Sequence, residues 1–134
     1  TVKSKGQLFI LVVDDEAAIL ETLVEILVTA GHRVVTAASG REALDRMNEA
    51  LYDLILTDVR MPDMDGRTLY QEIDRRWPRR TGRVIFMTGD TLRVRSDNQD
   101  ANHPRPVIEK PFRPNDVLRV VSQVAAAERR GAGH

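Results

Sequence analysis

The sequence lacks cysteine, net charge and any long apolar segment. Without cysteine, the chain of 134 residues forms neither a disulfide bond nor a thiolate metal site. Twenty basic and twenty acidic side chains cancel, so no overall field draws the protein to nucleic acid or to an anionic membrane. The longest apolar run, residues 8–13, is far shorter than the ~20 residues that span a bilayer. We therefore expect an intracellular, cytoplasmic domain that contacts neither nucleic acid nor membrane directly.

Short apolar runs alternate with helical patterns along the chain. Residues 8–13 are all apolar, which predicts a strand that is buried on both faces. From residue 17 to 30, apolar side chains recur every three or four positions, which predicts an amphipathic helix that stops at Gly31. The other predicted strands lie at 33–37, 53–57, 83–87 and 107–108, and the other predicted helices follow Ser39, Gly66 and Asn115 or Asp116. We expect one domain over residues 8–128, with tails at 1–7 and 129–134.

Regular alternation of strands and helices predicts an α/β fold. Its expected form is a doubly wound, five-stranded parallel sheet with helices on both faces. In the flavodoxin-like strand order 2-1-3-4-5, the first and third strands are neighbours. The stretch from residue 91 to 105 has very few apolar residues, so we expect its fourth helix to be short or mobile.

Polar side chains stand where four of the predicted strands end. Asp14 and Asp15 follow the first strand, Asp58 the third, Thr88 the fourth and Lys110 the fifth. Ligands of doubly wound sheets bind beyond the carboxyl ends of the strands, at the point where the strand order reverses. We therefore expect these five side chains to meet in one crevice.

Three clustered carboxylates repel one another unless a cation compensates their charge. Oxygen ligands without histidine or cysteine favour Mg²⁺ or Mn²⁺ over zinc. A carboxylate neutralised in this way can attack phosphorus as a nucleophile and form an aspartyl phosphate. Lys110 offers an ammonium, and Thr88 a hydroxyl, for the oxygens of the phosphoryl group.

Four motifs resemble those of the receiver domains of two-component response regulators. They are Val-Val-Asp-Asp-Glu at 12–16, Asp-Val-Arg-Met-Pro-Asp-Met-Asp-Gly at 58–66, Thr-Gly-Asp at 88–90 and Lys-Pro-Phe at 110–112. The resemblance extends from residue 8 to about residue 127, and the four motifs together are highly specific.

The resemblance implies a role for each residue of the crevice. Asp58 would accept a phosphoryl group from the phosphohistidine of a histidine kinase or a histidine phosphotransfer domain. Asp15 would bind the metal directly, Asp14 through a water, and Arg60 through its backbone carbonyl. Thr88 and Lys110 would contact the phosphoryl group, and the bond between Lys110 and Pro111 would be cis. The domain would then change a protein-binding surface, with self-phosphorylation and self-dephosphorylation as its only chemistry.

Two features distinguish this sequence within the family: the residue at the switch position and the pair of residues at the positions that tune the phosphoryl lifetime. Val107 occupies the position, three residues before the lysine, where receivers commonly carry an aromatic switch residue. Arg60 and Asp90 occupy two positions that tune the lifetime of the phosphoryl group. Their opposite charges favour pairing across the mouth of the site, which would hinder the hydrolytic water and slow dephosphorylation.

The same residues also allow other interpretations of their structure and function. Asp14 and Asp15 alone would be ordinary helix caps, and the basic run at 75–80 is typical of a solvated helix end. A phosphohydrolase with an aspartyl-phosphate intermediate would need a second acid near Asp58, where Arg60 stands. A degenerate receiver scaffold would have lost some of the acidic and phosphate-binding residues. The parent protein is either a stand-alone regulator or a larger hybrid histidine kinase to which this domain is covalently attached, and the stretches 88–92 and 107–112, which resemble receivers of hybrid kinases, favour the second.

Overall fold

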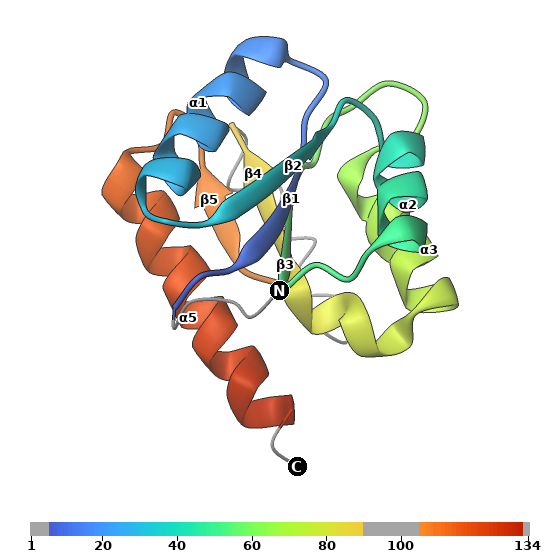
Figure 1. Cartoon of the computed structure of the whole chain (residues 1–134). Helices are drawn as coiled ribbons and strands as arrows, with labels where there is room; N and C mark the ends of the chain where they lie inside the picture. Colours follow the sequence, from blue (N-terminus) through green and yellow to red (C-terminus); the bar gives the residue numbers. More distant parts are fainter. Residues whose placement is uncertain (1–5, 90–104, 133–134) are drawn as a thin grey trace.

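A single parallel sheet lies at the centre of the computed structural model, which describes residues 6–89 and 105–132 (Figure 1). The strands follow the order β2-β1-β3-β4-β5, so the predicted order is confirmed. The strands are β1 (Phe9–Val13), β2 (Arg33–Ala37), β3 (Leu54–Asp58), β4 (Val84–Thr88) and β5 (Val107–Glu109). The helices are α1 (Ala17–Thr29), α2 (Gly40–Glu49), α3 (Gly66–Arg76), the 3₁₀ helix η1 (Pro78–Arg83) and α5 (Pro114–Ala132). The expected fourth helix falls, up to residue 104, outside the described residues.

Helices cover both faces of the sheet. In Figure 1, α1 and α5 lie on one side of it, and α2 and α3 lie on the other. Alternate residues of β1 enter the two cores: Ile10 and Val12 pack on the side of α1 and α5, and Leu11 and Val13 on the side of α2 and α3. All four side chains are fully buried, as the uninterrupted apolar run predicted.

Local signals set the ends of several helices. The Ser39 hydroxyl accepts a hydrogen bond from the Glu42 amide at 3.1 Å, and the Glu42 carboxylate accepts one from the Ala38 amide at 3.1 Å. The first of these bonds confirms Ser39 as the cap of α2, and the second ties the residue before the cap to the first turn of the helix. Gly31, with a φ of 97°, follows the end of α1 in the left-handed conformation that glycine adopts without strain.

The predicted cap of the last helix is wrong. Neither Asn115 nor Asp116 precedes α5, because the helix already begins at Pro114. The Arg113 carbonyl accepts hydrogen bonds from the amides of Asp116 and Val117. Proline suits the first helical position, since the amide hydrogen that it lacks would have no partner there. At its other end, α5 continues to Ala132, beyond the expected domain boundary at residue 128.

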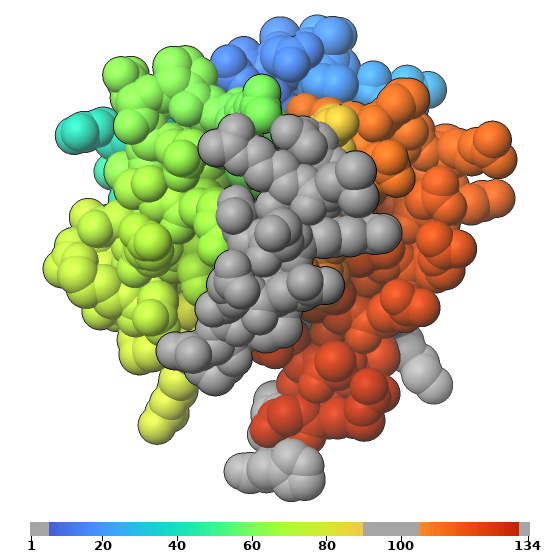
Figure 2. All heavy atoms as spheres, turned by 180° about the vertical axis from the view of Figure 1, so that it is seen from behind, coloured from blue at the N-terminus to red at the C-terminus, as the bar shows by residue number. Residues whose placement is uncertain are grey.

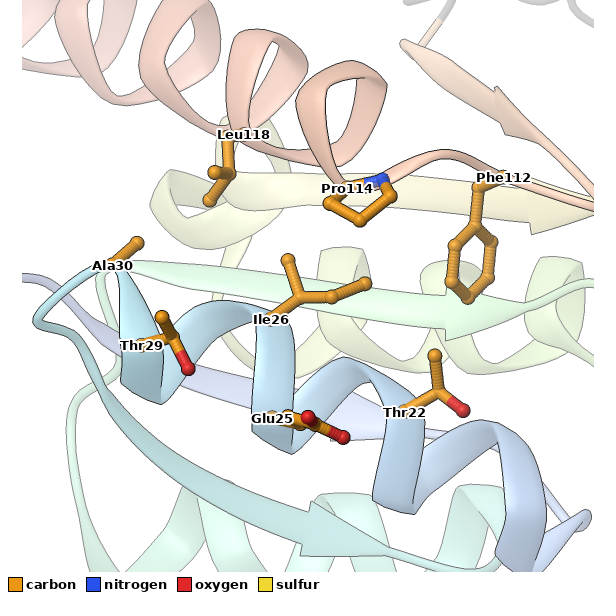
Figure 3. A pocket seen from close by; sticks show the side chains of 8 residues that line it. All are labelled: Thr22, Glu25, Ile26, Thr29, Ala30, Phe112, Pro114 and Leu118. Atoms are coloured by element: carbon orange, nitrogen blue, oxygen red, sulfur yellow. The ribbon is translucent and has the colours of Figure 1, made fainter.

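A pocket lies between α1 and α5 (Figure 3). It has a volume of about 560 Å³. The Ile26 side chain of α1 faces Leu118 and Pro114 of α5 across it, and Phe112 stands at one end.

Within the described part of the chain, none of the helices is long and apolar enough to cross a membrane.

His32 ties the turn after α1 to the start of the sheet. Its Nδ1 accepts a hydrogen bond from the Leu8 amide at 3.1 Å. Burial lowers the pKa of His32 below the usual value of 6.5, because the half-buried ring is favoured in its neutral form. A proton on Nδ1 would remove the acceptor that the Leu8 amide needs.

We expect His32 to make the protein less stable in mild acid. The unfolded chain takes up a proton on His32 near pH 6.5, whereas the folded chain does so only at lower pH. The free energy of unfolding should therefore fall as the pH drops below 6.5 through the folded pKa. Urea titrations between about pH 7 and pH 5 would measure this loss. A His32→Gln variant should lose less stability over the same range, and equal losses in the two proteins would contradict the prediction.

Candidate phosphoacceptor site

The carboxyl edge of the sheet brings together the residues that the sequence singled out. Asp58 and Thr88 are the last residues of β3 and β4, Asp14 follows β1, and Lys110 follows β5. The Asp14 amide donates to the carbonyl of Ala37 at the end of β2, at 3.1 Å. In Figure 2 the segments that follow these strands, coloured blue, green, yellow and orange, meet along the upper rim of the molecule.

Lys110 bridges two buried carboxylates. Its Nζ lies 2.9 Å from Oδ2 of Asp14 and 3.1 Å from Oδ1 of Asp58. Asp14 is fully buried and Asp58 is 6% exposed, so both carboxylates depend on this ammonium for charge compensation within the protein. Asp14 also accepts a hydrogen bond on Oδ1 from the Glu16 amide at 2.9 Å. The pairing of Lys110 with Asp14 was not predicted from the sequence, which assigned the lysine to the phosphoryl group alone.

Opposing effects set the protonation of this pair. Burial raises the pKa of Asp58, and the negative charges of Asp14 and Asp15 raise it further, while Lys110 lowers it. Burial lowers the pKa of Lys110, but its hydrogen bonds and charge interactions with Asp14 and Asp58 outweigh burial and raise it overall. The ammonium is therefore held in its charged form, and a second cation beside Asp58 would relieve the remaining repulsion among the carboxylates.

The carboxylates have the composition and spacing of a divalent cation site. One oxygen each of Asp14, Asp15 and Asp58 lies within 4.8 Å of the others, and among the described residues this is the cluster able to hold a metal ion. Asp15 is exposed and the other two are buried, so the cluster opens to solvent on one side. Hard oxygen ligands with an open side suit Mg²⁺, which usually keeps several waters and uses one or two carboxylates. The chain's own residues therefore fit the expected ion.

The loop after Asp58 folds back tightly on β3. The Gly66 amide donates to the Val59 carbonyl at 2.8 Å, which closes the loop at its base. A side chain on Gly66 would collide with the backbone carbonyl of Asp58, so only glycine fits there. Asp63 adopts a φ of 67° at the tip, which aspartate tolerates better than most residues. The sequence predicted a turn in this region, but it did not reveal the close approach of Gly66 to Asp58.

The remaining predicted site residues occupy the surroundings of this cluster. Thr88 is buried, and its carbonyl accepts a hydrogen bond from the Lys110 amide at 2.7 Å. Arg60 lies exposed in the loop that follows Asp58. Val107 pairs with Phe86 of β4 and packs against the core on the side of α3. The predicted cis bond between Lys110 and Pro111 is confirmed, whereas Asp90 lies outside the described residues.

Comparison with known proteins identifies the family of this domain. The family model of the response regulator receiver domain matches residues 10–122. The chain belongs to this receiver family. Phosphoryl acceptance is the general function of receiver domains, and they generally bind Mg²⁺ at an acidic pocket like the one described above.

Three relatives illustrate the contexts in which such receivers occur. The receiver protein CpdR of Brucella abortus is 30% identical over 118 residues, covering 88% of this chain and 97% of CpdR. The sensor kinase CckA of Brucella abortus is 33% identical over 121 residues, covering 89% of this chain but only 13% of the kinase. The structure of the chemotaxis protein CheY4 of Vibrio cholerae aligns with a TM-score of 0.80 at 28% identity, covering 89% of this chain and 99% of CheY4.

Proposed function

We propose that this receiver accepts a phosphoryl group on Asp58. In the reaction, a carboxylate oxygen of Asp58 forms a bond to phosphorus as the phosphorus–nitrogen bond of a donor phosphohistidine breaks. The bonding electrons leave with the imidazole nitrogen of the donor. The observation that carries the proposal is the burial of Asp58 between Asp14, Asp15 and the Lys110 ammonium at the carboxyl edge of the sheet.

Each neighbouring group has a proposed part in this reaction. Asp15, Asp14, Asp58 and the Arg60 carbonyl would hold Mg²⁺ or Mn²⁺, which offsets the negative charge that gathers when the phosphate approaches. Lys110 would contact one phosphoryl oxygen through its ammonium, and Thr88 would donate its hydroxyl to another. The Lys110 ammonium donates hydrogen bonds to both Asp14 and Asp58. If it turned to the phosphoryl group, Asp14 would lose its hydrogen bond, so phosphorylation of Asp58 would also change the surroundings of Asp14.

Phosphorylation by a small donor tests the proposed function without a kinase. The wild-type protein, incubated with acetyl phosphate and Mg²⁺, should gain the mass of one phosphoryl group in intact-protein mass spectrometry. Omitting Mg²⁺ or adding a chelator should prevent the gain. No mass increase with Mg²⁺ present would refute the proposal.

We propose that the physiological donor is a histidine kinase or a histidine phosphotransfer domain, and that the receiver acts in the cytoplasm. The similarity to a segment of CckA supports attachment to a larger kinase, and the near full-length match with CpdR supports a free-standing regulator. In both arrangements the domain signals by changing a protein-binding surface rather than by turning over an external substrate. Steady turnover of phosphate esters would instead favour a phosphohydrolase.

Arg60 should lengthen the lifetime of the phosphoryl group. Its exposed side chain stands two residues after Asp58, where it can shield the mouth of the site from the hydrolytic water. We expect Arg60→Ala to lose the phosphoryl group severalfold faster than the wild type, measured as decay after acetyl phosphate is removed. Arg67→Ala, on the first turn of α3, provides a control in which the lifetime should stay unchanged. Slower decay in Arg60→Ala would contradict this role.

A further inference from the structure

Gly40 begins helix α2 at a buried position. Glycine weakens a helix by about 1 kcal/mol relative to alanine, and Gly40 does not adopt the positive φ that would require it. The close approach of another side chain explains why glycine occupies this position. A Cβ atom on Gly40 would lie 2.7 Å from Sδ and 2.8 Å from Cγ of Met64. Gly40 therefore leaves a socket on α2, and Met64 fills it.

Met64 belongs to the loop that carries the acceptor. Residues 59–65, the acceptor loop, connect Asp58 with α3, and the hydrogen bond from Gly66 to Val59 closes the loop at its base. Met61 anchors one part of the loop in the core, where it is 8% exposed. Met64 anchors the opposite part in the Gly40 socket. Because the hydrogen bond holds the two ends of the loop together, a shift of Met64 would change the backbone conformation of the loop between them.

The socket is held rigidly on the α2 side. The hydrogen bonds of Glu42 with Ser39 and with Ala38 span Gly40 and stabilise the first turn of α2. Ala37, before this turn, and Ala43, within α2, are both buried in the same core as Met61. A side chain added at Gly40 would therefore push Met64 and the acceptor loop outward rather than move the helix. The severe overlaps are with Sδ and Cγ of Met64, whereas its Cβ would lie 3.1 Å away, so the Met64 side chain beyond Cβ is what would have to shift.

We propose that Gly40 is a positioning residue for the acceptor loop. Its missing side chain lets Met64 hold the loop against α2, and this contact sets the position of Arg60 relative to Asp58. The inference rests on the proposed function, in which the Arg60 carbonyl is a metal ligand. Outer-shell groups that hydrogen-bond a metal ligand change metal affinity about 10- to 100-fold when they are mutated. The contact between Gly40 and Met64 acts one step further from the proposed ligand, so we expect an effect at the lower end of this range.

Mg²⁺ binding and phosphorylation in four proteins test this inference. We expect Gly40→Ala to weaken Mg²⁺ binding about 10-fold, measured by calorimetry on the folded protein, and to slow phosphorylation by acetyl phosphate in parallel. The double variant Gly40→Ala with Met64→Ala makes room for the added methyl group and should recover most of the affinity. Gly82→Ala is the matched control, because its Cβ would meet the carboxylate end of the long Glu128 side chain instead of the acceptor loop. It should bind Mg²⁺ as the wild type does.

A purely structural role for Gly40 predicts a different pattern. Gly40→Ala would then lower the unfolding midpoint while the folded protein keeps wild-type Mg²⁺ affinity, and that result would overturn the inference. A double variant that binds as weakly as Gly40→Ala would also overturn it. If Gly40→Ala does not fold, Met64→Ile changes the other side of the same contact, because it places a second branch on Cβ next to Gly40. It should weaken Mg²⁺ binding more than Met64→Ala does, and equal binding in these two variants would refute the inference.

Measurements on the wild-type protein distinguish failure of the proposed function from failure of the positioning role of Gly40. Failure of the wild type to bind Mg²⁺ and to accept phosphate would refute the proposed function itself. Normal behaviour of the wild type, together with unchanged Mg²⁺ affinity in the Gly40 and Met64 variants, would refute only the positioning role.

Discussion

Asp58→Asn should abolish phosphorylation by acetyl phosphate. The amide has nearly the same shape as the carboxylate but lacks the anionic oxygen that attacks phosphorus. Because Asp58 is the buried acid at the end of β3, and Asp14 is fully buried beside Lys110, we expect no other carboxylate to take over the reaction. Intact-protein mass spectrometry should show no gain of a phosphoryl group under conditions that modify the wild type completely.

Two controls make the loss at Asp58 interpretable. Asp63→Asn changes an exposed acid at the tip of the acceptor loop, and asparagine also tolerates its φ of 67°. This variant should be phosphorylated as the wild type is. Asp58→Asn should also be at least as stable as the wild type without Mg²⁺, because it removes one of three clustered charges and leaves Lys110 paired with Asp14. Full phosphorylation of Asp58→Asn would place the acceptor elsewhere.

Replacing Lys110 should have the second large effect, on stability. In Lys110→Met the carboxylates of Asp14 and Asp58 lose the ammonium that lies 2.9 Å and 3.1 Å from them. Breaking a buried ion pair by removing one partner costs about 3–5 kcal/mol, because the remaining charge stays buried. We expect a decrease of this size in the free energy of unfolding, measured by urea denaturation in the presence of a chelator.

Mg²⁺ should restore much of the stability that Lys110→Met loses. The ion would then be the cation that compensates the cluster, so its stabilising effect should be greater in the variant than in the wild type. Arg119→Met serves as the control, because Arg119 pairs with Asp116 on the exposed surface of α5 at 3.3 Å. Such surface pairs contribute about 0–1 kcal/mol. A Lys110→Met protein as stable as Arg119→Met in chelator would contradict the prediction.

The sequence predicted the sheet and its crevice because both depend on local patterns. The apolar run at residues 8–13 has no polar position, which only a strand covered on both faces accommodates. The polar residues at the ends of four of the strands then located the site, since parallel strands place their carboxyl ends at one edge. These patterns therefore predicted that Asp58 and Lys110 lie close together.

Features that depend on packing between distant segments were not predictable in the same way. The contact of Gly40 with Met64 joins two turns whose separate patterns indicate only a helix start and a loop. The start of α5 at Pro114 was missed because Asn115 and Asp116 are strong capping residues by composition. The 3₁₀ helix η1 has no apolar periodicity, so the run of arginines from residue 75 gave no sign of it.

The bridge formed by Lys110 joins parts of the chain that are far apart in sequence. Lys110 is 96 positions from Asp14 and 52 positions from Asp58, so the site closes only after β5 has added to the edge of the sheet. Contacts of such long range form late and slowly during folding. Recovery of phosphoacceptor activity during refolding would therefore lag behind the recovery of helical signal. Only molecules in which β5 has joined the sheet would then be able to accept a phosphoryl group.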